Sequence, residues 1–600
     1  MGKHAEPSGK SAGGVPGSAA RVRPLPVRSA VRLRRPLDIW HKPALSAVAA
    51  LAIPDLTLYA LGRLDLILYT SAGAMCALYA HGLPYAARAR TLLWVVLGMV
   101  ASLGVALTAA SLITSTALLV VGASLVAAVH KVVCDATRIG PPGNVILTFI
   151  TASAFFVPQH LGQVPPHLAL ALGAGGLAWL VCMAPALLRP QGPERISVAR
   201  ALEAAAGLLR TEAGAGGGEP AGAAHARHAA AATVNAAWHT LFLVPVATPA
   251  KAAARSGLER LLVRAESALG GTEDADEVGA GAGPHEVRFT GAEAGRLGSW
   301  ARELRGGRAV PEVAVSAARA GELAGAVAET PGRRPAPGQP RGVRAVLARL
   351  APGSPLLPIG VRVAAGCVLA GWASMAVGVG HPYWAVVTAA SIYQANTTLS
   401  WQRALQRTLG NLLGLLLYTA LLPLIHGGPL AMIAIVLACQ FGAEAGITRN
   451  YWLGSVCVTP MALLLTQFGS QVPAGTLIAD RWTDTLVGAV VGLVCCVLVT
   501  NRRAANRIEA ALGRVAAAEA DAVRLLTAGP TAGADEAREA GWARDRLAGG
   551  LLELREAVEV AAGEWWQPAL PQERIAHAEQ RGHRALAGLV RRLSAPALAA

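Results

Sequence analysis

Charged residues are scarce in this sequence. They make up only 15% of its 600 residues, while 53% are hydrophobic and the mean hydropathy is +0.44. A soluble globular protein of this size carries about 25% charged residues. The deficit therefore argues against an ordinary soluble chain. It predicts membrane-spanning segments, with the lipid bilayer as the first partner.

Lysine is scarcer still, so the formal net charge of +16 comes almost entirely from arginine. In membrane proteins such an excess usually lies on cytoplasmic segments, and no nucleic-acid motif accompanies it here. We expect no nucleic acid among the partners.

Motifs for catalysis and for cofactor binding are missing. The sequence has no P-loop, which argues against ATP-driven pumping by this chain alone, and it has no GxSxG or HExxH motif. Its eight cysteines form no CxxC pair, so neither a zinc site nor a disulfide framework is indicated. Most of them lie in apolar runs, which is typical of buried thiols. We expect no enzyme, no catalytic residues, no cofactor and no metal.

The first 40 residues lack the apolar core of a signal peptide. They contain six arginines between positions 21 and 35 instead. We expect residues 1–40 to form a disordered basic tail on the cytoplasmic side.

Twelve apolar stretches are long enough to cross a bilayer, whose core of about 30 Å needs roughly 20 helical residues. The first six lie at 43–62, 66–83, 92–110, 112–130, 144–160 and 168–188, and the second six at 357–379, 382–400, 408–425, 429–446, 451–469 and 482–500. The expected fold is an all-α polytopic membrane protein with two six-helix halves and helical cytoplasmic regions.

The expected domains follow this layout. They are the tail at 1–40, a first transmembrane half at 41–188, a cytoplasmic helical region with Gly/Ala/Pro-rich flexible joints at 189–356, a second transmembrane half at 357–500, and C-terminal cytoplasmic helices at 501–600. The two soluble regions are expected to pack together.

Basic residues in the turns set the expected orientation. With the N-terminus inside, the cytoplasmic turns hold Arg88, Arg90, Lys131, Arg138, Arg403, Arg407 and Arg449, and the external turns hold Arg63 and Arg481. This asymmetry predicts that both termini and residues 189–356 are cytoplasmic, in a multi-pass protein of the plasma membrane.

The most informative stretch runs from residue 381 to residue 414. It opens with Tyr383 and Trp384, and a polar patch with Gln394 and Asn396 follows. A half-polar span is costly in lipid, so this patch should face water or protein, and interrupted spans of this kind point to binding sites.

A helix follows that patch. Its residues Arg403, Arg407, Gly410 and Gly414 are spaced i, i+4, i+7, i+11 and share one face, with Asn411 beside them. Two interpretations stay open for this face: a packing seam anchored by two arginines, or a seam that also faces a substrate path.

The same spacing recurs later in Arg481, Thr485, Gly488 and Gly492. The two copies lie three spans apart and would have opposite orientation, the usual construction of secondary transporters. Coincidence is the alternative, because Arg, Thr and Gly are common near span ends.

Ionisable residues inside spans are informative because burying charge in lipid is expensive. Asp55 lies in the middle of the first span, where it either carries a coupling proton or caps a helix break after Pro54; we favour the second. Glu444 is expected to pair with Arg449 or with an arginine of the 403–407 turn, as a structural or a coupling ion pair.

Several of these residues carry a resemblance to a known family. They are Tyr383, Trp384, Thr388, Arg403, Arg407, Gly410, Gly414, Arg481, Thr485, Gly488 and Gly492. In these positions residues 350–503 resemble the fusaric-acid-resistance-like (FUSC) integral membrane family, with Asn411 standing where the pattern suggests Thr. The resemblance implies export of aromatic carboxylates, and plant relatives are anion channels.

Three functions are therefore weighed. The first is a secondary exporter of small organic, in particular aromatic, anions; the second is a passive anion channel on the same scaffold. The third is a membrane scaffold of the cell envelope that transports nothing. A homo-oligomer stays open in each case.

Overall fold

The computed structural model describes residues 27–34, 38–214, 220–245, 248–270, 284–311, 343–351, 354, 356–469, 472–498, 504–528, 534–565 and 570–594. Every regular element in these ranges is helical. Most of the basic tail predicted at 1–40, and most of the residues of the predicted flexible joints, lie outside the described residues.

The membrane helices form two sets along the chain. The first set is α2 (His41–Ala60), η1 (Leu64–Leu66), α3 (Ile67–Ala74), η2 (Met75–Leu78), α4 (Tyr85–Leu112), α5 (Thr116–Thr137), α6 (Val145–Ala154), α7 (Val164–Met183) and α8 (Pro185–Leu188). The second set is α15 (Leu356–Ala376), α16 (Tyr383–Ile392), α17 (Thr397–Ile425), α18 (Pro429–Ile447), α19 (Tyr451–Gly469) and α20 (Ala474–Leu498).

Nine of the twelve predicted spans are helices long and apolar enough to cross a membrane, counted over the described residues. The other three are short: the segment Leu64–Leu78, α6 and α16. A helix of ten residues rises only about 15 Å, half of a bilayer core. The helix lengths therefore do not show twelve full spans, although each predicted stretch contains a helix.

The short helices are placed where lipid does not reach them. All ten residues of α16 are buried, and so are seven of the eight residues of α3. Interrupted backbone at membrane depth is tolerated when protein surrounds it, because its free polar groups then find partners. Hydropathy cannot distinguish such a buried half-helix from a lipid-facing span.

One hydrophobic core joins both halves. It includes Met99, Val120 and Phe155 from the first half and Trp384 and Tyr418 from the second. Large apolar side chains such as Trp94, Val361 and Val490 are exposed on the outside of this bundle, as expected for surface that faces lipid.

The long helices of the middle and C-terminal regions form a second bundle with its own core, which we call the soluble bundle. They are α9 (Gly192–Gly214), α10 (Pro220–Phe242), α11 (Pro249–Ser267), α12 (Pro284–Arg305), α21 (Ala504–Thr527), α22 (Ala534–Ala562) and α23 (Gln572–Ser594). Leu202 and Trp238 from the middle region share this core with Leu547 and Leu589 from the C-terminal region, so the two soluble regions do pack together.

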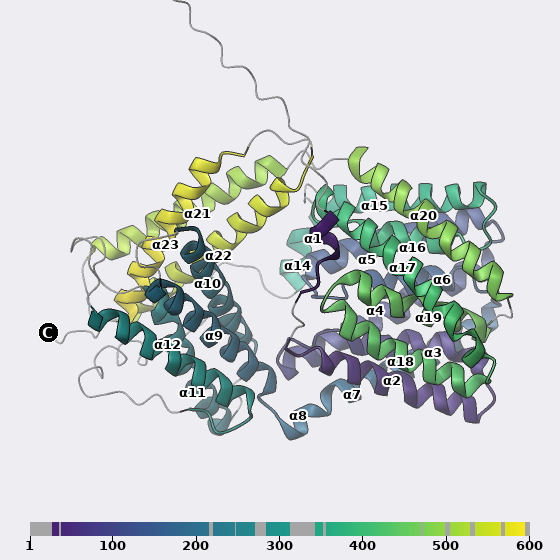
Figure 1. Ribbon diagram of the computed structural model, residues 1–600, viewed down its shortest axis with the longest axis horizontal. Coiled ribbons are helices and arrows are strands. Elements are labelled where there is room, and N and C mark those ends of the chain that lie inside the picture. Colours follow the sequence, from purple (N-terminus) through teal and green to yellow (C-terminus); the bar gives the residue numbers. More distant parts are fainter. Residues whose placement is uncertain are drawn as a thin grey trace, which may run out of the picture.

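Figure 1 shows this soluble bundle beside one end of the membrane helices. The short helices α1 (Val27–Val31) and α14 (Val343–Leu350) lie at the boundary between the two parts.

Candidate functional site

A cavity of about 1110 Å³ lies between the two membrane halves. All three short helical segments contribute to its wall, through residues such as Tyr69, Phe149 and Tyr383, and α5, α17, α18, α19 and the connecting segments supply most of the rest. Discontinuous helices around a cavity are the arrangement in which many secondary transporters bind their substrates.

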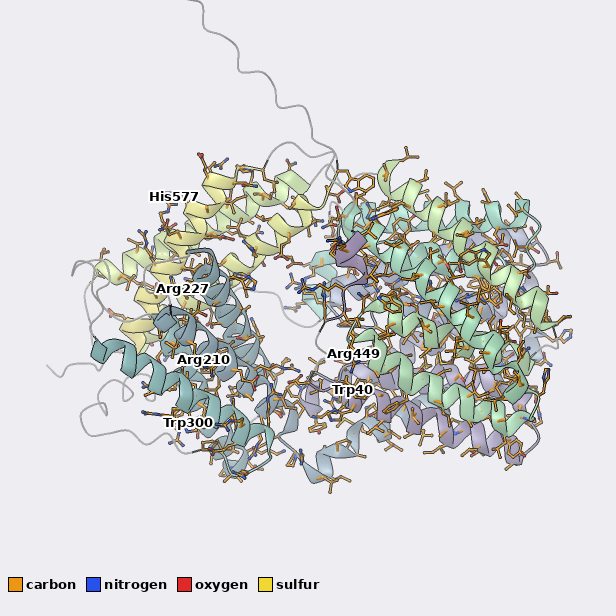
Figure 2. All side chains as sticks on the ribbon, viewed as in Figure 1. Trp40, Arg210, Arg227, Trp300, Arg449 and His577 are labelled. Atoms are coloured by element: carbon orange, nitrogen blue, oxygen red, sulfur yellow. The ribbon has the colours of Figure 1, made fainter. Side chains whose placement is uncertain are left out.

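The cavity extends along most of the length of the membrane helices. Along α19 its wall runs from Tyr451 to Thr466, a rise of roughly 22 Å at 1.5 Å per residue. Arg449, just before α19, belongs to the same wall and lies at the end that faces the soluble bundle (Figure 2). The Thr466 end must therefore be the far end.

Arg481 is the most unusual residue of this wall. Its side chain is fully buried, and its three guanidinium nitrogens have no hydrogen-bond partner among the described residues. The face of Trp384 lies 5.0 Å from the guanidinium carbon, a cation–π distance. The sequence-based assignment of Arg481 to an external turn is wrong, because α20 begins at Ala474 and contains it.

A buried carboxylate and a partly buried His–Asp pair lie near Arg481 on α20 and its neighbours. The carboxylate of Asp484 accepts a hydrogen bond from the Ser374 hydroxyl, while its second oxygen has no partner in the described part of the chain. Two residues before α16 begins, His381 Nδ1 lies 2.8 Å from a carboxylate oxygen of Asp480, and the His381 ring stacks on Trp384 at 4.7 Å.

Arg403 and Arg407 line the cavity nearer the soluble bundle. Arg407 donates from Nη1 to the Tyr451 hydroxyl at 2.9 Å, and the guanidinium carbon of Arg403 lies 3.9 Å from the centre of the Tyr451 ring. The Arg407 Nε is left without a protein partner among the described residues. The two arginines thus hold one tyrosine between them and keep donor capacity.

The residues proposed from the 381–414 stretch separate into two groups. Tyr383 and Gln394 belong to the cavity wall, together with the two arginines. Trp384, Asn396 and Asn411 are not part of it: Trp384 lies against Arg481, as described above.

Asn411 joins three helices. Its Nδ2 donates to Thr485 Oγ1 on α20 at 2.5 Å, and its Oδ1 accepts from Thr459 Oγ1 on α19 at 2.6 Å. A side chain with both hydrogen-bonding groups occupied inside the bundle positions helices and is not available to a substrate.

Asn396 faces the soluble bundle. It is the N-cap of α17, accepting from the Leu399 amide at 2.8 Å, and its Nδ2 donates to the Glu559 carbonyl at 3.2 Å. Next to it, Thr397 donates to the Glu564 carboxylate at 2.6 Å. This part of the polar patch therefore faces protein, one of the two environments expected for it, and this protein is the C-terminal part of the chain.

A family comparison covers this region. Residues 368–495 match the model of a family described as fusaric acid resistance protein-like. The second membrane half therefore carries a fusaric-acid-resistance-like segment. This confirms the resemblance inferred from its motifs, and the segment contains Arg403, Arg407 and Arg481 of the cavity wall.

Two curated relatives resemble part of the chain. A protein of Bacillus subtilis (strain 168) named "Uncharacterized membrane protein YvaC" is 30% identical over 194 residues, which is 32% of this chain and 29% of that protein. A Synechocystis sp. protein named "Uncharacterized protein slr1298" is 29% identical over 140 residues, 23% of this chain and 18% of that protein. The chain thus spans less than a third of the length of either relative. No solved structure matches.

Two pairs of glycines hold the fusaric-acid-resistance-like segment together at close range. A Cβ added at Gly410 would lie 2.5 Å from the Ser455 Cβ, and one at Gly414 would lie 2.6 Å from the Thr459 Cβ, both on α19.

The second pair packs on the buried half-helix α16 in the same way. There a Cβ at Gly488 would lie 2.6 Å from the Ala385 carbonyl oxygen, and one at Gly492 would lie 3.2 Å from the Ala389 Cα. Each stripe in the sequence thus corresponds to one close helix pair, α17 with α19 and α20 with α16.

Asp55 and Glu444, the acidic residues singled out in the spans, lie in different surroundings. Helix α2 continues without a break through Pro54, so the interpretation of Asp55 as the cap of a helix break is wrong. Asp55 is fully buried and both carboxylate oxygens lack a partner within the described ranges.

Glu444 lies on the cavity wall, as Arg449 does. The ion pairs found among the described residues do not include one between Glu444 and Arg449 or an arginine of α17. No group of three or more possible metal ligands occurs in the described part of the chain.

Proposed function

We propose that this protein is a secondary transporter of the plasma membrane that exports small organic anions, aromatic ones in particular. The observation that carries the proposal is Arg481, a fully buried cation on the wall of a membrane cavity, whose guanidinium nitrogens have no partner among the described residues. The fusaric-acid-resistance-like match supports membrane transport in general.

A bound anion would compensate the buried positive charge of Arg481. A charged side chain in a membrane interior costs at least about 2.5–3.5 kcal/mol, and such residues normally pair with an opposite charge or mark a substrate pathway. Arg481 has no ion pair among the described residues, so a bound anion would provide the missing compensation. A guanidinium presents a planar fork of donors that matches a carboxylate with two hydrogen bonds.

The aromatic preference has its own support. Trp384 lies against Arg481, while Tyr383 and Phe156, whose rings stack at 5.5 Å, both line the cavity. Flat apolar surfaces beside a cation suit a planar ring that carries a carboxylate.

Three cations give the anion a route through the cavity. Arg403 and Arg407 lie in the part near the soluble bundle, which we assign to the cytoplasm together with both termini from the distribution of basic residues. An anion gathered there would pass to Arg481, and the proton motive force would drive its release outside. Glu444 on the cavity wall and Asp484 beside Arg481 are the carboxyl groups we propose for proton coupling, with Asp55 farther away.

A resistance assay tests this function. A deletion strain is challenged with a panel of aromatic carboxylic acids and complemented with the wild type, Arg481→Gln, Arg481→Lys or the control Arg90→Gln. Arg90 is exposed and lies outside the cavity wall. The wild type and the control should restore resistance to at least one acid, whereas Arg481→Gln should not.

Protein levels in the membrane separate binding from structure. Arg481→Gln removes a buried charge that no hydrogen bond within the described chain supports, so the variant should accumulate at the wild-type level. Loss of resistance with normal accumulation supports the proposal. Full resistance with Arg481→Gln contradicts it, and flux that stays strictly downhill without proton dependence would identify a passive anion channel.

A further inference from the structure

The bundle-facing end of the cavity is occupied by a piece of the chain itself. Residues 27–34, which we call the strap, comprise α1 and the three residues after it, and they lie across α17 and the start of α19. Figure 1 shows α1 at the boundary between the membrane helices and the soluble bundle.

Side chains at this end bind consecutive backbone carbonyls of the strap. Gln406 Nε2 and Asn450 Nδ2 both donate to the Ala30 carbonyl at 2.8 Å, and Asn450 also donates to the Arg32 carbonyl at 3.1 Å. The indole N–H of Trp452 donates to the carbonyl of Val31 at 3.3 Å. Three successive carbonyls held by three side chains form a binding surface for a peptide backbone.

Further contacts seal the strap onto the cavity. Ala30 is fully buried, and Gln402 donates to the Ser29 hydroxyl at 3.0 Å. The amide of Arg34 donates to the Arg449 carbonyl at 3.0 Å. Ser29 and Arg34 themselves belong to the cavity wall, so the strap closes part of the wall at this end.

The chain is then anchored to the soluble bundle only four residues later. Asp38 forms ion pairs with Arg200 of α9 and Arg305 of α12, and Arg305 also pairs with Glu203 at 2.7 Å. Burial alone would raise the pKa of Asp38, but the hydrogen bonds and charges of the two arginines outweigh it and lower the pKa to about 2. This anchor is therefore charged at every physiological pH, and protonation does not release it.

We propose that the strap is a gate: seated, it closes the cytoplasmic end of the cavity, and its anchor at Asp38 makes its position depend on the soluble bundle. The surface formed by Gln406, Asn450 and Trp452 is its binding site. A shift of the bundle that carries Asp38 away from the membrane pulls the strap off this surface and opens the cavity.

Thiol accessibility tests the gate without assuming any substrate. Val458 lines the cavity about two turns beyond the start of α19, and Val458→Cys is a conservative reporter. A small sulfonated methanethiosulfonate is added from the side of the soluble bundle, and the reaction of the chain without the reporter is subtracted as background.

Two changes to the strap are compared with a matched control. Ala30→Glu puts a long charged side chain where none fits and should raise the reaction rate at residue 458 about tenfold. The same change at the exposed neighbour Leu33, which is 54% exposed, should leave the rate unchanged. Asp38→Asn weakens the anchor and should give an intermediate rise.

A chain lacking residues 2–34 is measured as well, so that the result does not rest on one substitution. The proposal is overturned if this chain reacts at the same rate as the full chain, or if Ala30→Glu and Leu33→Glu raise the rate equally. Anion flux in proteoliposomes is recorded in parallel. Faster labelling without flux in any variant would support the gate and count against the proposed transport.

Discussion

Arg407 and Arg481 are the same residue type on one cavity, yet their surroundings differ. Arg407 donates to Tyr451 and keeps one nitrogen free, while the guanidinium of Arg481 makes no hydrogen bond among the described residues and lies against the face of Trp384. An arginine with some of its hydrogen bonds already made to protein suits transient anion binding, and an arginine without protein hydrogen bonds suits tighter anion binding. We therefore assign the main anion site to Arg481 and a gathering role to Arg403 and Arg407.

Lysine at both gathering positions separates geometry from charge. Arg403→Lys combined with Arg407→Lys keeps the charge that orients the helices, so the protein should reach the membrane at normal levels. It removes the planar fork, the stacking on Tyr451 and the bidentate geometry. We expect about tenfold slower export, equivalent to about 1.4 kcal/mol, measured as resistance or flux. Export at the wild-type rate would show that these arginines are anchors.

The stability of the folded protein should depend on pH through the Glu564 carboxyl group. Burial raises the pKa of Glu564 above its ordinary value of 4.5, while the hydrogen bond from Thr397 and the charge of Arg362 oppose the shift. Since the folded protein then holds this proton more tightly than the unfolded chain, stability falls as pH rises from about 4.5 to the folded pKa.

The test is thermal stability in detergent as a function of pH. Glu564→Gln cannot ionise and can still accept from Thr397, so its Tm should lose less than that of the wild type as pH rises from 4.5 to 7. Glu573, exposed at the start of α23, serves as the control when changed to Gln. Identical pH profiles for wild type and Glu564→Gln would disprove the assigned shift.

Sequence reasoning at the residue scale singled out Arg403 and Arg407, which line the cavity, and placed Arg481 wrongly in a turn. The spacing of Arg481 with Gly488 and Gly492 already placed it on a helix face. The assignment of basic residues to turns was preferred to this helical spacing, because a cation near the end of a span usually marks a turn. Asn396 and Asn411 were candidates for the substrate path because a polar side chain within a span indicates a function. The sequence does not show which group forms hydrogen bonds with that side chain.

Half-length helices are the feature that distinguishes this membrane fold at the scale of elements. The segment Leu64–Leu78, α6 and α16 are shorter than the other membrane helices, and all three line the cavity. Their ends expose backbone groups that full spans would satisfy internally, and this polarity surrounds the cavity. Their existence was predictable from hydropathy, but their length was not, because burial against other helices leaves no signal in composition.

Glycine packing sets the spacing of the helices that carry the arginines. Gly414→Leu would push α17 away from α19, since even a Cβ would approach the Val456 carbonyl to 2.8 Å. Overpacking usually costs about 1–3 kcal/mol, so we expect clearly less folded protein in the membrane and a lower Tm in detergent.

The matched control for this change is Gly173→Leu on α7. Gly173 is exposed, and nothing lies within 4 Å of a Cβ built there, so this variant should behave as wild type. Equal yield and Tm for Gly414→Leu and Gly173→Leu would contradict the close helix contact.

At the scale of the whole molecule, the described residues form two attachments between the soluble bundle and the second membrane half. One is the N-cap region of α17 against the end of α22, and the other is the strap with its anchor at Asp38. Composition and periodicity predicted the two bundles and their membership. They could not predict the attachments, because backbone carbonyls such as those of Ala30, Glu559 and Gly563 supply many of the bonds and carry no side-chain signature.

The proposed transport requires that the cavity binds and moves an organic anion at Arg481. The most direct measurement is uptake of a radiolabelled hydroxybenzoate into proteoliposomes under an imposed pH gradient, compared between wild type, Arg481→Gln and Arg90→Gln. We expect saturable accumulation above equilibrium for the wild type and for Arg90→Gln, and at least a tenfold lower rate for Arg481→Gln. Equal uptake by Arg481→Gln and the wild type would contradict it.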